Sequence, residues 1–149
     1  LTFGINTETN NQVPTNISSV QGDPTDFIGR FLGSSSGSQF PTMFDSGTNH
    51  LLFYSTEISQ CGDVYCPSSP TAWISQIMNY DLSGSAIALS SIISAPTGYY
   101  GLIPDLGIVA ASGDGLYGLP FYFGKNVYLG FVGSNSVMGS GPTWGFVNQ

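Results

Sequence analysis

The sequence predicts an all-β fold, and three observations support this prediction. No segment shows a long amphipathic helical pattern, and short apolar stretches instead recur between turn signals. Twenty glycines and nine prolines supply turns throughout the chain. The 149 residues suffice for one domain with a hydrophobic core. We therefore expect a single domain, a sandwich or barrel, over residues 1–149.

Each expected element follows from a local pattern of apolar residues or turn residues. The expected strands cover residues 1–5, 27–32, 40–44, 50–54, 73–80, 85–93, 108–111 and 144–147. The expected loops and turns cover residues 6–26, 33–38, 55–72 and 94–107. The strands 73–80 and 85–93 are expected to form a hairpin through Leu82-Ser83-Gly84. Residues 116–132 are the most aromatic stretch of the chain.

Composition excludes several classes of function. The chain has nine acidic residues and only two basic residues, with a net charge of −7. Two basic residues cannot neutralise a nucleic-acid backbone, so no nucleic-acid partner is expected. No apolar run approaches the roughly 20 residues that span a bilayer, so no membrane span is expected. Because 41% of the residues are hydrophobic and only 7% are charged, the chain does not have the composition of a disordered protein.

Cys61 and Cys66 are the two cysteines of the chain. Their spacing differs from the two-residue gap of zinc and thioredoxin motifs. A disulfide closing a short loop is the favoured interpretation, and a pair of free thiols is the alternative. A disulfide implies an oxidising compartment, so we expect a secreted or periplasmic protein.

The segment Met43–Asn49 is the most informative for function. Apolar residues lead to Asp45, and Leu51-Leu52-Phe53 follow the turn. An acid between two apolar strands is costly unless it is hydrogen-bonded. Gly47 allows the backbone to turn its N–H toward the carboxylate, and the hydroxyls of Ser46 and Thr48 can orient it. This arrangement suits a catalytic aspartate, and an Asx-type turn between two strands is the alternative.

No metal or cofactor is expected from the sequence. His50 is the single histidine, and no local spacing of carboxylates accompanies it. The glycine pattern of Gly113–Gly118 matches a dinucleotide-binding fingerprint in spacing alone. Pro120 follows at once, and no acidic residue occurs after Asp114, so dinucleotide binding is not expected.

Asp45-Ser46-Gly47-Thr48 with its apolar flanks resembles the active-site motif of pepsin-like aspartic peptidases. Many pepsin-like lobes carry a following Cys-x4-Cys loop, which Cys61 and Cys66 match. Leu116-Tyr117-Gly118 resembles the apolar-apolar-Gly element that crosses beneath the active-site loop of such lobes. The aromatic stretches 119–123 and 127–131 fit the turn and strand that come after it.

The chain also resembles, from end to end, the carboxy-terminal lobe of an uncharacterised family of exported bacterial proteins with pepsin-like signatures. The matching stretches are residues 1–5, 44–49, 65–67, 118–125 and 139–142. This resemblance implies that residues 1–149 form one pepsin-like barrel lobe. It also implies that the chain is the carboxy-terminal half of a longer, two-lobed protein.

The resemblance implies half of an aspartic-endopeptidase site. Pepsin-like catalysis uses two aspartates that hold one water and share one proton. Asp45 would be catalytic, with Gly47 shaping the turn and Ser46 and Thr48 orienting the carboxylate. The second aspartate would come from an amino-terminal lobe or a second copy of the chain, and the substrate would be a peptide or protein. Asn49 departs from the serine often found at that place in the motif.

A non-catalytic exported module is the alternative function. Such a module would be structural, self-assembling or peptide-binding on the same scaffold. The low charge of the chain opposes self-association only weakly, and exposed strand edges on a lobe invite pairing with another chain. The sequence leaves both functions open.

Overall fold

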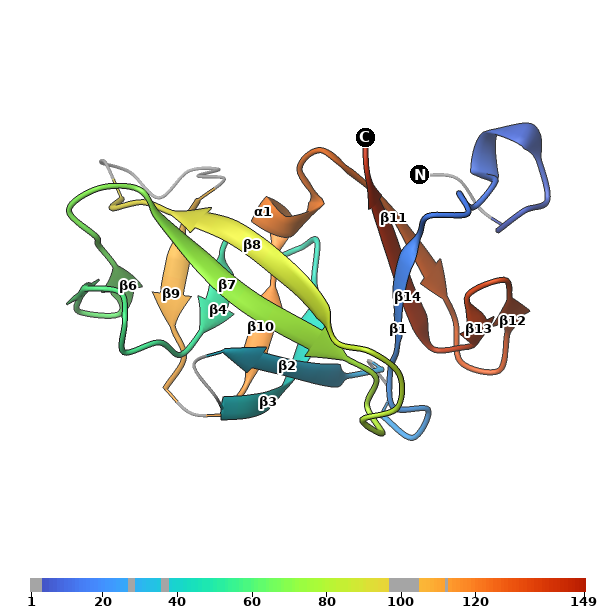
Figure 1. Cartoon of the computed structure of the whole chain (residues 1–149), viewed down its shortest axis with the longest axis horizontal. Coiled ribbons are helices and arrows are strands. Elements are labelled where there is room, and N and C mark those ends of the chain that lie inside the picture. The colour runs from blue at the N-terminus through green and yellow to red at the C-terminus, as the bar shows by residue number, and fades with distance from the viewer. Residues whose placement is uncertain (1–3, 27–28, 36–37, 97–104, 112) are drawn as a thin grey trace.

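The computed structural model describes residues 4–26, 29–35, 38–96, 105–111 and 113–149. The all-β prediction is confirmed, because strands dominate this part of the chain (Figure 1). Its helical segments are the 3-10 helix η1 (Thr9–Asn11) and the single turn α1 (Leu119–Tyr122). Within the same residues, no helix has the length and apolar character needed to cross a membrane.

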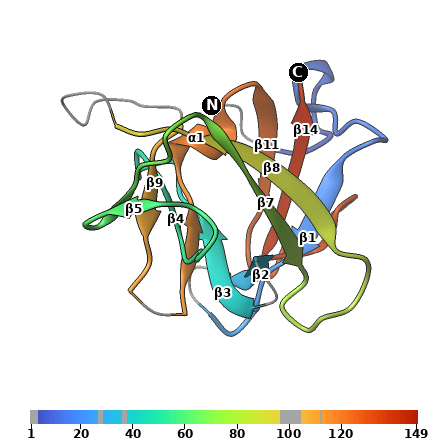
Figure 2. The ribbon, with the colours of Figure 1, turned by 60° about the vertical axis from the view of Figure 1, so that its left-hand side comes forward.

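The larger sheet has nine strands and curls into a half-barrel (Figure 2). Its strands lie in the order β5-β6-β9-β4-β10-β3-β2-β7-β8. In that order they are β5 (Gln60–Cys61), β6 (Val64–Tyr65), β9 (Gly107–Val109), β4 (Leu51–Phe53), β10 (Gly115–Tyr117), β3 (Ser38–Phe44), β2 (Phe31–Ser35), β7 (Thr71–Met78) and β8 (Ile87–Ile93). The strands β7 and β8 form the longest hairpin, with Thr71 opposite Ile93 and Ile77 opposite Ile87.

A second sheet has three antiparallel strands in the order β1-β14-β11. These strands are β1 (Ser18–Gln21), β14 (Thr143–Asn148) and β11 (Lys125–Gly130). Figure 1 places this sheet to one side of the curled sheet, with α1 between them at the top. A two-stranded ribbon, β12 (Asn135–Ser136) and β13 (Gly139–Ser140), connects β11 to β14.

Phe44 marks the centre of the core between the two sheets. It comes from β3, and its ring lies 4.7 Å from that of Phe31 and 4.2 Å from that of Phe121. Across the interface, its ring lies 5.5 Å from Trp144 and 6.0 Å from Phe146 of β14. The residue before the candidate aspartate therefore joins the curled sheet, α1 and the three-stranded sheet.

The strand β10 is inserted between β3 and β4, which do not pair with each other. It runs parallel to β3, with Tyr117 opposite Phe44, and antiparallel to β4, with Tyr117 opposite Leu51. The turn that connects β3 to β4 therefore passes over the end of a strand from much later in the sequence. This crossing fixes the position of Asp45.

Several predicted strands are confirmed, and one predicted turn is shorter than expected. Strands occupy Ser38–Phe44 and Leu51–Phe53, and the predicted hairpin appears as Thr71–Met78 with Ile87–Ile93. The Ser/Gly turn was predicted over residues 33–38, but residues 33–35 belong to β2, and Ser35 already lies opposite Ser38 of β3. The strand position of Gly33 requires glycine, because a Cβ here would lie 2.7 Å from the ring of Phe40.

Other expected elements differ from the structure. The predicted loop 6–26 contains β1, in which Val20 is the only apolar residue, so it showed no alternation. The predicted loop 55–72 contains the short hairpin of β5 and β6. Gly4 and Ile5 of the predicted first strand lie in a bend, and residues 1–3 lie outside the described residues. Residues 97–104 of the predicted turn region also lie outside them.

Candidate functional site

The backbone of the Asp45–Thr48 turn is held from both sides. The Asp45 N–H donates to the carbonyl of Tyr117, which ends β10, at 3.0 Å. The Thr48 N–H donates back to the carbonyl of Asp45 at 3.3 Å. The turn is thus closed on itself and bonded to the inserted strand. Asp45 lies where the buried strand β3 reaches the surface, and its side chain is partly exposed.

Both carboxylate oxygens of Asp45 accept hydrogen bonds. The Gly47 N–H donates to Oδ1 at 2.8 Å, and the Thr48 hydroxyl donates to Oδ2 at 2.6 Å. The Thr48 hydroxyl and the Gly47 N–H both favour the charged form and hold the pKa of Asp45 below its usual range. The group is therefore an oriented carboxylate that stays ionised in mild acid.

The backbone of Gly118 packs directly against this turn. A Cβ at Gly118 would lie 2.0 Å from the carbonyl oxygen of His50 and 2.6 Å from that of Thr48. No side chain fits in that space. The next residue, Leu119, donates its N–H to the Thr48 carbonyl at 2.6 Å. The backbone at Gly118 and Leu119 therefore supports the turn that orients Asp45.

Tyr122 of α1 belongs to the electrostatic surroundings of Asp45. Burial and the negative charge of Asp45 together raise the pKa of Tyr122 to about 12. Its phenol is therefore neutral across the physiological range. The sequence placed Tyr122 in an aromatic stretch that fits the turn and strand after the crossing element, and it assigned this residue no role in the site. The only available signal was its position just after the element expected to cross beneath the loop.

Two neighbours of the turn have no part in holding the carboxylate. Ser46 is exposed, and among the described residues its hydroxyl makes no hydrogen bond to Asp45. Asn49 Oδ1 instead lies 2.9 Å from Nδ1 of His50. Burial lowers the pKa of His50, so its imidazole is neutral at pH 7. The structure thus brings Gly47 and Thr48 to Asp45, but not Ser46.

The chain matches the family described as "Protein of unknown function (DUF3443)" over residues 1–146. It belongs to the DUF3443 family. No curated protein and no solved structure matches it. The family assignment agrees with the expected resemblance to an uncharacterised family.

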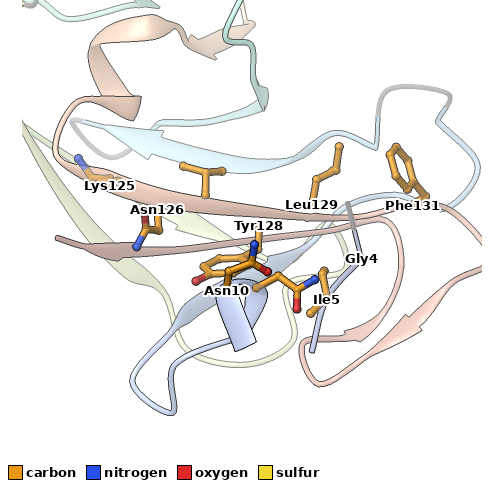
Figure 3. A pocket seen from close by; sticks show the side chains of 10 residues that line it. Gly4, Ile5, Asn10, Lys125, Asn126, Tyr128, Leu129 and Phe131 are labelled. Carbon is orange, nitrogen blue, oxygen red and sulfur yellow. The ribbon is translucent and has the colours of Figure 1, made fainter. Parts of the chain in front are cut away.

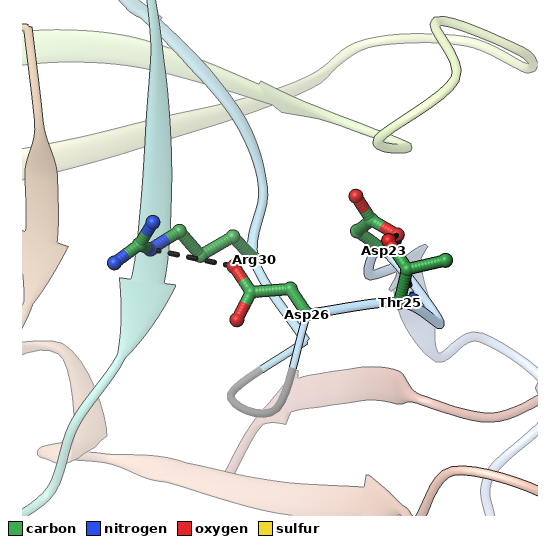
Figure 4. A network of polar contacts seen from close by, with 4 residues as sticks. All are labelled: Asp23, Thr25, Asp26 and Arg30. Atoms are coloured by element: carbon green, nitrogen blue, oxygen red, sulfur yellow. Dashed lines mark hydrogen bonds and ion pairs between the residues drawn. The ribbon is translucent and has the colours of Figure 1, made fainter.

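Among the described residues, neither cation of this DUF3443 chain forms an ion pair with Asp45. Arg30 Nε lies 3.6 Å from Oδ2 of Asp26, in the segment after β1 (Figure 4). The same figure shows Thr25 beside Asp23, whose Oδ1 accepts the Thr25 N–H and hydroxyl at 2.8 and 2.7 Å. Lys125 Nζ lies 4.9 Å from the ring centroid of Phe121. Within the described part of the chain, hydrogen bonds rather than an ion pair thus stabilise the charge of Asp45.

The described residues contain no cluster of His, Cys, Asp or Glu that could hold a metal ion. The two hydrogen bonds to Asp45 make the turn a site with an oriented carboxylate. Such a group can accept a proton from a water molecule or bind a hydrogen-bond donor.

Cys61 and Cys66 form the predicted disulfide. It closes the hairpin of β5 and β6, in which Gly62 adopts a positive φ of 68°. The hairpin extends the edge of the curled sheet through the pairing of Val64 with Ile108 of β9. The disulfide therefore stabilises a sheet edge. It is typical of proteins in oxidising compartments.

Proposed function

We propose that this chain supplies one aspartate of a two-aspartate acid peptidase site. The observation that carries the proposal is the Asp45 carboxylate, which is partly exposed and receives one hydrogen bond on each oxygen. Its resemblance to the pepsin-like motif and the crossing of β10 beneath the turn both support it. The substrate would be a peptide or protein, met outside the reducing cytosol, as the disulfide suggests.

In this proposal, Asp45 is the ionised member of the pair. The Thr48 hydroxyl and the Gly47 N–H lower its pKa, so in mild acid it keeps its charge and can take a proton from the attacking water. The other aspartate would carry the shared proton and donate it to the substrate carbonyl oxygen. That residue comes from an amino-terminal lobe or from a second copy of the chain.

Replacing Asp45 with Asn tests the proposal. We expect the native protein to digest casein at pH 4, with inhibition by pepstatin. The Asp45→Asn variant should lose this activity with only a small decrease in the unfolding midpoint, because the amide preserves the size of the side chain and one of its two acceptors. Asp81→Asn is the matched control, because Asp81 is an exposed acid bonded to Ser83 in another turn. Casein cleavage by Asp45→Asn at the wild-type rate would contradict the proposal.

A non-catalytic module is a second candidate, favoured by the surface. Ile74 and Ile92 are 60% and 51% exposed on the outer face of the β7–β8 hairpin. The outward positions of that hairpin carry no charge, and β8 is an edge strand. Such surfaces favour association between chains. Ordered oligomers that Asp45→Asn leaves unchanged, without casein cleavage by the native protein, would support this candidate.

A further inference from the structure

Among the described residues, no strand pairs with the outer edge of β11. This strand is an edge strand of the three-stranded sheet and pairs with β14 on one side. The Gln149 N–H donates to the Gly124 carbonyl at 2.9 Å. Because bonded and non-bonded pairs alternate along antiparallel strands, the main-chain groups of the even-numbered residues of β11 bond to β14. The main-chain N–H and C=O groups of the odd-numbered residues Lys125, Val127 and Leu129 therefore face away from the sheet.

A groove of about 500 Å³ lies along this edge. Gly4, Ile5, Asn10 and Asn11 form its opposite wall, as Figure 3 shows for Asn10 and Ile5 facing Tyr128. The Tyr128 hydroxyl donates to the carbonyl of Gln12 at 3.2 Å and ties this wall to the strand. The groove thus has an unpaired strand edge on one side and a fixed wall on the other.

The described lining of the groove mixes apolar and neutral polar groups, and it carries charge only at one end. Leu129 is 38% exposed and Phe131, just beyond the strand, is 68% exposed. Asn10 and Asn126 add neutral polar groups. Of the described residues that line it, Lys125 alone is charged, and it stands at the amino-terminal end of β11. Among the described residues, no carboxylate pairs with Lys125.

We propose that this groove binds the carboxy-terminal end of an extended peptide as an added antiparallel strand. Only an extended main chain presents donors and acceptors at the spacing of the free groups of β11. Antiparallel addition brings the carboxy terminus of the peptide to the beginning of β11, where Lys125 stands. The Lys125 ammonium then pairs with the terminal carboxylate, and apolar peptide side chains cover Leu129 and Phe131. This site does not use Asp45, so it is independent of the peptidase proposal.

Two peptides that differ only at the carboxy terminus provide the test. The probe is the fluorescein-labelled hexapeptide Thr-Val-Thr-Val-Thr-Val with a free carboxylate, and the control is its carboxy-terminal amide. Fluorescence anisotropy with the full chain should show that the amide binds about tenfold more weakly. In Lys125→Gln the two peptides should bind equally, and in Lys125→Arg the preference for the acid should remain. Equal binding of both peptides to the wild type, or no binding at millimolar protein, would overturn the proposal.

A proline substitution tests the strand edge itself. Leu129→Pro removes an N–H that faces the groove and leaves the bonds to β14, since proline is tolerated at such edge positions. We expect it to weaken peptide binding at least tenfold, whereas Leu129→Thr, which keeps the N–H, should bind within about threefold of the wild type. Equal binding by both variants would overturn strand addition. A concentration-dependent dimer that Leu129→Pro abolishes, without peptide binding, would assign the edge to a second copy instead. If Leu129→Pro does not fold, the acid-to-amide ratio in Lys125→Gln still decides.

Discussion

Asp45 is oriented by two short-range hydrogen bonds that depend on the residue types around it. Gly47 presents its N–H and Thr48 its hydroxyl to opposite oxygens of one carboxylate. These contacts lie within three residues of Asp45, so the sequence pattern alone could indicate them. The proximity of Tyr122 could not be indicated in this way, because it depends on how α1 packs beneath the turn.

Removing the Thr48 hydroxyl should change the titration of Asp45. In Thr48→Val we expect the pKa of Asp45 to rise toward its ordinary value, because the larger of the two stabilising hydrogen bonds is lost. Carboxyl-carbon NMR of labelled aspartate measures this shift. Ser46→Ala is the matched control and should leave the titration unchanged, since Ser46 makes no bond to the carboxylate. A shift in Ser46→Ala as large as that in Thr48→Val would contradict the assignment.

Thr42, unlike Asp45, is a buried polar residue of the core. Its side chain is 1% exposed, and in the described part of the chain its hydroxyl has no hydrogen-bond partner. Thr42→Val replaces this hydroxyl with a methyl group of similar size, so we expect the free energy of unfolding to rise by about 1 kcal/mol. Ser75→Ala should lower it by about 1 kcal/mol, because the buried Tyr117 hydroxyl loses its acceptor at 2.7 Å. Urea denaturation measures both, and a loss of stability in Thr42→Val would contradict the assignment.

At the scale of elements, the insertion of β10 between β3 and β4 organises the candidate site. The sequence indicated strands at residues 40–44 and 50–54, because each is a short apolar run beside a turn. The element at Leu116–Gly118 was implied by the resemblance to pepsin-like lobes. The helical turn α1 was harder to foresee, since a short apolar run fits a strand or a helix equally. Pro120 near its start and Gly118 before it are the features that begin the helical turn.

Gly118→Ala should disrupt this crossing. The new methyl group would meet the carbonyl oxygens of His50 and Thr48, both of which belong to the backbone and cannot rotate away. We expect a loss of about 3 kcal/mol in unfolding free energy. Gly62→Ala is the comparison, because open space surrounds that position and only its positive φ of 68° opposes the change. It should cost about 1 kcal/mol. Thermal and urea unfolding measure both changes. A smaller loss of unfolding free energy in Gly118→Ala than in Gly62→Ala would contradict the close approach of the backbone at Gly118.

On the scale of the whole molecule, two sheets share one aromatic core with very few charges around it. The sequence predicted this class of fold because alternation and turn residues mark most strands of the curled sheet. It did not predict the three-stranded sheet, because β1 (Ser-Ser-Val-Gln) becomes a strand only through its pairing with the distant β14. Tertiary contact, rather than local propensity, forms that strand.

The stability of the whole chain should fall in acid in two steps. The pKa of His50 is lowered by burial, and those of Asp23, Asp45 and Asp81 are lowered by hydrogen bonds. Each group binds protons less readily in the folded state, so stability decreases as pH falls through the interval below its ordinary pKa. Urea midpoints should decline modestly below pH 6.5 and further below pH 3.8. His50→Gln should remove the first step. A urea midpoint that rises on acidification would contradict the lowered pKa values of these groups.

The pairing of β1 with β14 has a consequence for the order of folding. Ser18 lies opposite Phe146, so the three-stranded sheet joins residues from near both ends of the described chain. On a ribosome, β1 emerges well before β14 and stays without its partner until residue 148 has been made. The hairpin of β7 and β8 can form by local contacts long before that. Closure of the three-stranded sheet is therefore a late, long-range event, of the kind that slows folding in β proteins.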